Sequence, residues 1–86
     1  MRAAVKLAKP AWANRIEKLR ARLSLSQTEF AHKLGVSAMA VSRWERGINE
    51  PPATCYVTLG KMAGPDECWF YWERIGFNKR ELGKYL

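Results

Sequence analysis

Two closely spaced sets of helix-boundary signals constrain the fold of this chain more than any other feature. Ser26-Gln-Thr-Glu29 is a capping box, in which the Ser hydroxyl and the Glu carboxylate each bond a backbone N–H that the first helical turn leaves unpaired. Gly35 supplies the left-handed residue that ends a helix, and Ser37 can cap a second helix that Gly47 ends. The sequence therefore predicts two short helices joined by a tight turn, the second from about Ala38 to Arg46.

Helical spacing of apolar residues, with further cap signals, predicts three or four more helices. Trp12, Ile16, Leu19 and Leu23 recur at steps of four, three and four, which is typical of one buried helix face. Prolines, glycines and a cap at Asn78 bound the others. We expect these helices at about Ala11–Leu23, about Ala53–Ala63, from Asp66 to Gly76, and from Lys79. No segment is predicted to be a strand, so the fold class is all-α with five or six helices.

Length and composition exclude several classes of protein. A chain of 86 residues buries one small core, so we expect a single domain over residues 1–86, with a basic arm at 1–10, a core at 11–63 and an aromatic segment at 64–86. The longest apolar run, Cys68 to Trp72, is too short for a membrane span, and no export signal is visible. Two isolated cysteines and one histidine supply no metal site, so we expect a reduced, cytoplasmic protein without a cofactor.

Charge and aromatic residues divide between the two halves of the chain. Residues 1–46 carry ten Lys or Arg against three Glu, which accounts for the whole formal net charge of +7. Seven of the ten aromatic residues lie beyond residue 46. This asymmetry suggests that the first half meets a polyanion and the second half meets protein.

Two short helices with a glycine at the bend form a helix-turn-helix, which can place its second helix in the DNA major groove. The stretch from Leu25 to Gly47 resembles the Cro and phage-repressor family of helix-turn-helix proteins. The similarity covers about residues 12–63 and rests on these features: Gln27 opening the first helix, Ala31 at the crossing, Gly35 in the turn, Val41 in the core, and the ending Trp44-Glu45-Arg46-Gly47. The resemblance implies a lambda-repressor-like domain that binds double-stranded DNA.

One face of the second helix is predicted to meet DNA. Met39, Ser42, Arg43 and Arg46 share it at the 3.6-residue period, with Ala38 at its edge. Arg43 is expected to read a base, since a guanidinium can bond guanine O6 and N7 together, whereas Ala38 and Met39 offer only apolar contact. The expected base-reading set is Ala38, Met39, Ser42 and Arg43, and the expected phosphate-contacting set is Gln27, Ser37, Arg46 and Asn49. A solvated basic face is the alternative for the two arginines.

The family resemblance also implies an ion pair between Arg20 and Glu45, which makes Glu45 structural rather than catalytic. Arg2, Lys6 and Lys9 are either a DNA-embracing arm or a frayed terminus. No nucleophile, base or metal-ligand set points to an enzyme or to a small-molecule substrate.

The C-terminal aromatic residues predict assembly with protein. Trp69, Phe70, Tyr71 and Trp72 exceed what one inner helix face can cover, so we expect some of them at a homodimer interface. Alternatively, the last helix covers them through Leu82 and Leu86. We therefore expect a dimeric transcriptional regulator, most simply a repressor. The alternative is an antitoxin-like or other protein-interaction module that uses the aromatic helix.

Overall fold

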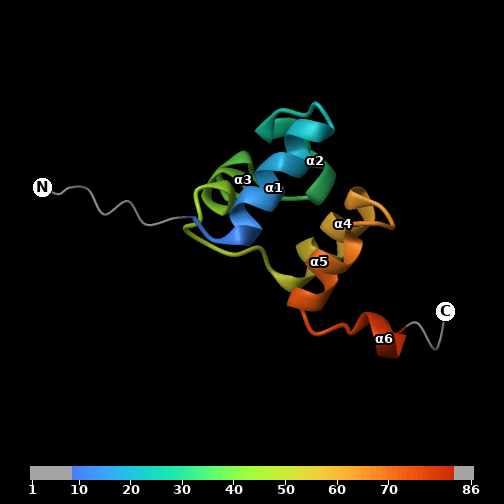
Figure 1. Cartoon of the computed structure of the whole chain (residues 1–86). Coiled ribbons are helices and arrows are strands. Elements are labelled where there is room, and N and C mark those ends of the chain that lie inside the picture. Colours follow the sequence, from blue (N-terminus) through green and yellow to red (C-terminus); the bar gives the residue numbers. More distant parts are fainter. Residues whose placement is uncertain (1–8, 83–86) are drawn as a thin grey trace, which may run out of the picture.

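The computed structural model describes residues 9–82, and every regular element in that range is a helix (Figure 1). This confirms the all-α prediction. In chain order the helices are α1 (Ala11–Arg22), α2 (Gln27–Leu34), α3 (Ala38–Glu45), α4 (Ala53–Ala63), α5 (Cys68–Arg74) and α6 (Lys79–Leu82). No helix of the described range is long and apolar enough to cross a membrane.

The predicted caps define α2 and α3. The Ser26 hydroxyl accepts a hydrogen bond from the Glu29 backbone N–H at 3.0 Å, and the Glu29 carboxylate accepts one from the Ser26 N–H at 2.8 Å. The bond from the Ser26 N–H to the charged carboxylate lowers the pKa of Glu29. Gly35 ends α2 with φ of 72°, and the Ser37 hydroxyl accepts from the Ala40 N–H at 3.1 Å. The chain therefore reverses between α2 and α3 within three residues.

The start of α5 differs from the sequence prediction. We expected the helix to include Asp66 and Glu67, but it begins at Cys68. Gly64 has φ of 93°, and its carbonyl accepts from the N–H groups of Glu67 at 3.2 Å and Cys68 at 2.9 Å. These bonds close a turn over residues 65–67, which places both carboxylates before the helix rather than in its first turn.

A single hydrophobic cluster joins α1 to α5. α2 packs against α3, α1 packs across α3, and α4 contacts α2 on one side and α5 most extensively on the other (Figure 1). Side chains from all five helices are buried in this cluster: Ile16, Leu19, Phe30, Val41, Trp44, Tyr56, Leu59 and Tyr71. The aromatic second half therefore contributes to the same core as the basic first half.

Tyr71 is a core residue, so it is not among the aromatic residues that can lie at a dimer interface. Its side chain is fully buried at 0% exposure, and its hydroxyl donates to the Arg15 carbonyl of α1 at 3.2 Å. Burial raises the pKa of Tyr71 to about 12. It joins α5 to α1 within one chain and offers no surface to a partner.

Gly60 allows α4 and α5 to approach closely. The indole of Trp72 lies directly over Gly60, where a Cβ would overlap the ring, and its N–H donates to the Val57 carbonyl at 3.1 Å. Only a residue without a side chain fits beneath this ring. The contact fixes the distance between the two helices.

We predict that Gly60→Ala destabilises the protein, although alanine is the better helix former by about 1 kcal/mol. The added methyl would force the Trp72 ring out of its site, and overpacking of this kind typically costs about 1 to 3 kcal/mol. Urea unfolding followed by circular dichroism measures the loss. In a Trp72→Phe background the smaller ring leaves room, so the same substitution should cost much less; equal losses in both backgrounds would show that the close contact is not the cause.

Candidate nucleic-acid interface

The outer face of α3 brings together the residues that the helical period predicted. Met39 is 56% exposed, Arg43 and Arg46 are exposed, and Ser42 is half-buried between them. Val41 and Trp44 point the other way into the core. Ala38, at the start of the helix, is half-buried. The helix therefore presents one continuous basic and apolar surface to solvent.

Arg43 and Arg46 differ in how they are held. The Arg46 Nε donates to the Ser42 carbonyl at 3.3 Å and to the Ser42 hydroxyl at 3.2 Å, which fixes its stem along the helix. Among residues 9–82, no hydrogen-bond or ion-pair partner of the Arg43 guanidinium is found. All five of its N–H donors are available to a ligand. Arg43 is thus the better-placed group for a bidentate contact, and the Ser42 hydroxyl is already engaged.

A buried ion pair holds α3 against α1. Arg20 Nε lies 2.6 Å from Glu45 Oε2, and a second guanidinium nitrogen donates to Oε1 at 2.9 Å. The third nitrogen donates to the Leu25 carbonyl at 2.9 Å, and the contact with Glu45 raises the pKa of Arg20. Glu45 is only 4% exposed. This fork-to-fork geometry fixes both separation and rotation of the two helices.

Gln27 belongs to the same cluster. Its side-chain amide donates to Glu45 Oε1 at 3.1 Å, and the residue is half-buried at the start of α2. A phosphate contact was expected for Gln27, and its partner Glu45, which lies 18 positions away, was not predicted from the sequence. In the structure this amide N–H joins α2 to the Glu45 carboxylate of α3, which Arg20 of α1 also bonds.

Lys9 is tied into the domain by two bonds. Its ammonium donates to Glu17 Oε1 at 3.1 Å and to the backbone carbonyl of Glu45 at 3.0 Å. Of the three residues expected in a DNA-embracing arm, Arg2 and Lys6 lie outside the described residues. Lys9 therefore connects the start of α1 to the end of α3, and these two bonds use part of the hydrogen-bonding capacity of its ammonium group.

The loop after α3 adds a residue to this surface that was not predicted from the sequence. Ile48 is 57% exposed, and its N–H bonds the Arg43 carbonyl at 2.9 Å, so it lies at the end of the same helix. Its position directly after Gly47 could have indicated this placement, because the residue after a helix-ending glycine commonly bonds a carbonyl of the last helical turn. Asn49 is exposed beside it. Both extend the outer surface of α3 beyond its last turn.

Glu50 anchors this loop to the second half of the chain. Its carboxylate accepts from the Tyr56 hydroxyl of α4 and from the Arg74 guanidinium of α5. The bond from Arg74 lowers the pKa of Glu50. The loop bearing Ile48 and Asn49 is therefore held against α4 and α5.

The segment that forms this surface matches a family model described as helix-turn-helix, over residues 16–54. This match confirms the resemblance of residues 16–54 to the Cro and phage-repressor type of helix-turn-helix. No curated protein and no solved structure matches the chain. In this DNA-binding family α3 is the recognition helix, and α2 is the helix that supports it.

No group of three or more His, Cys, Asp or Glu within the described range is arranged to hold a metal ion. The outer surface of α3 offers hydrogen-bond donors, positive charge and exposed apolar side chains. These groups suit binding to a polyanion that also presents hydrogen-bonding groups, as the base edges of DNA do.

We predict that Arg20→Ala strongly destabilises the domain. The substitution leaves the Glu45 carboxylate buried without its cation, a loss that typically costs about 3 to 5 kcal/mol. Chemical denaturation gives the change in the free energy of unfolding. Lys18→Ala on the exposed side of the same helix is the matched control and should change stability by less than about 0.5 kcal/mol; a similar small effect for Arg20→Ala would contradict a structural role.

Proposed function

We propose that this protein is a sequence-specific regulator of transcription, of the repressor type, that binds double-stranded DNA through α3. The observation that carries the proposal is the Arg43 guanidinium, exposed and without a partner among the described residues, on a helix locked in place by Arg20 and Glu45. A rigid helix with a free bidentate donor is what base recognition in the major groove requires. Because chromosomal DNA is the ligand, we place its action in the cytoplasm, at the nucleoid.

The roles proposed on this surface follow from chemistry. Arg43 would bond O6 and N7 of a guanine, while Met39 and Ala38 would contact thymine methyl groups. Arg46 is held along the helix by Ser42 and would meet a phosphate, as would Ser37 and Asn49 at the two ends of α3. Gln27 donates one amide N–H to Glu45, and its second amide N–H would be the donor to a phosphate.

The Arg43→Ala variant should lose roughly 1 to 3 kcal/mol of specific binding and relax preference at one base position, while affinity for random DNA persists. The matched substitution Arg46→Ala should weaken binding evenly across sequences, because phosphate contacts carry no base information. Selection of bound sites from a random pool, followed by titration of selected and random duplexes, measures both. Equal losses on the two duplexes for Arg43→Ala would rule out base recognition by this residue.

We propose further that two copies meet through the outer side of α5. Phe77 is 45% exposed, and Trp69 and Trp72 are half-buried with their rings stacked edge to face at 5.2 Å. Phe70 is less available, because the Arg15 guanidinium lies 4.3 Å over its ring. Exposed aromatic surface is typical of interfaces, and a second copy suits a protein that reads inverted repeats.

Removal of Trp69 or Phe77 tests this dimer. Trp69→Ala and Phe77→Ala should each shift sedimentation toward the monomer and flatten the DNA titration, while helical content is retained. Leu23→Ala removes an exposed apolar side chain elsewhere and should leave assembly unchanged. A dimer of this kind should prefer half-sites about 10 base pairs apart. A wild-type chain that stays monomeric on its selected site would overturn the dimer and favour a protein-interaction module that uses the same aromatic surface.

A further inference from the structure

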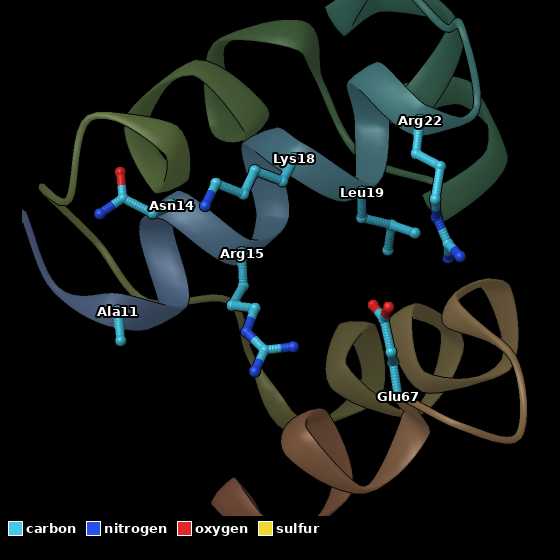
Figure 2. Close-up of a pocket in the computed structure, with 7 residues that line it drawn as sticks. All are labelled: Ala11, Asn14, Arg15, Lys18, Leu19, Arg22 and Glu67. Carbon is cyan, nitrogen blue, oxygen red and sulfur yellow. The ribbon is translucent and has the colours of Figure 1, made fainter.

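A groove separate from the recognition helix lies between α1 and the turn before α5 (Figure 2). Its volume is about 490 Å³. Arg15, Lys18 and Arg22 line it from α1, and Glu67 lines the opposite wall. Three positive charges therefore face one negative charge across an open depression.

None of the three cations is neutralised by a carboxylate within the described part of the chain. The Arg15 guanidinium rests over the Phe70 ring, and an Arg22 nitrogen donates to the Ala63 carbonyl at 2.9 Å. For Lys18, no partner is found among residues 9–82. Phe70 and the end of α4 position the two arginines while their charge stays available. The groove is thus a built cationic site, with two of its three cations held in place.

This groove and the recognition helix lie on different sides of α1. Arg20, which bonds Glu45 of α3, is two residues from both Lys18 and Arg22, and so points to the opposite side of the helix. Figure 2 shows Arg15 and Arg22 directed into the gap toward α5, with α3 on the other side of α1. A ligand can therefore occupy the groove while α3 lies on DNA.

We propose that the groove binds an acidic segment of a partner protein. The cations at positions 15, 18 and 22 follow steps of three and four, so they form a row about 10 Å long on one helix face. Such a row fits carboxylates spaced along an extended or helical peptide. The carboxylate of Glu67 would repel an unbroken phosphate backbone, but it can accept a hydrogen bond from a peptide N–H or from a lysine of the segment.

The interaction would connect the DNA-bound regulator with other proteins. Its contacts are exposed charge pairs, which contribute modestly to affinity but strongly to the rate and selectivity of encounter. We therefore expect a weak, salt-sensitive association that adds to DNA binding rather than replacing it.

A fluorescein-labelled 14-residue peptide with glutamates at every third or fourth position tests the proposal by anisotropy, with the full chain as titrant. The double variant Lys18→Ala, Arg22→Ala should bind at least about fivefold more weakly. The control double variant Lys61→Ala, Arg80→Ala removes one Lys and one Arg outside the groove and should bind like the wild type. Lys18→Ala alone removes no internal bond found in the described structure, so it should still weaken binding if the double variant fails to fold. Glu67→Gln should strengthen binding of this peptide, because it removes the charge that repels the glutamates while the amide oxygen can still accept a peptide N–H.

A second experiment separates this site from the DNA surface. The peptide is titrated into protein already saturated with its selected duplex, and the groove variant is titrated with that duplex alone. Persistence of peptide binding on DNA, together with unchanged specific DNA affinity of the variant, supports the proposal. Displacement of the peptide by DNA, equal losses for the two double variants, or binding of tripolyphosphate without binding of the peptide would each overturn it.

Discussion

The buried pair of Arg20 and Glu45 fixes the orientation of the recognition helix, and much of the surface depends on it. Glu45 ends α3, two residues after Arg43, so any rotation of α3 that displaced Glu45 from Arg20 would also move the Arg43 guanidinium that faces solvent. Desolvating two charges offsets much of their attraction, and apolar residues of similar size can be as stabilising. What the pair supplies beyond stability is a defined geometry, because a bidentate contact tolerates little change in angle. Gln27 and Lys9 add bonds to the side chain and the backbone of the same residue.

The second half of the chain completes this arrangement. A domain of this size has little core to spare, and α5 contributes a fully buried tyrosine whose hydroxyl bonds the backbone of α1. Gly60 permits the close packing of Trp72 on α4, and Glu50 ties the loop after α3 to α4 and α5. The loop at the end of the recognition helix is therefore positioned by residues that lie outside the matched helix-turn-helix segment.

Local signals in the sequence were sufficient to predict the two helices on either side of the bend. The features that were not predicted depend on tertiary packing. Ser26, Glu29, Gly35 and Ser37 act on their own neighbours, so their roles could be predicted from spacing. The bounds of α4 were also predicted. The start of α5 was wrong, because the bonds to the Gly64 carbonyl form a turn that acidic residues after a proline do not reveal. Tyr71 and its aromatic neighbours look alike in sequence, and only the direction from which α1 approaches α5 distinguishes buried from accessible rings.

The position of α1 in the fold changes the interpretation of the uneven charge along the chain. The sequence suggested a basic half for a polyanion and an aromatic half for protein, yet α1 contributes cations to two surfaces. Arg20 bonds Glu45 inside the fold, whereas Arg15 and Arg22 point toward α5, and Lys18 lines the same groove. Salt dependence of DNA binding reflects only those cations that displace counterions from phosphates. The net charge of +7 therefore overstates the charge that α3 and its flanking loops can bring to DNA, and a substantial share of it lies on a face where another molecule can bind.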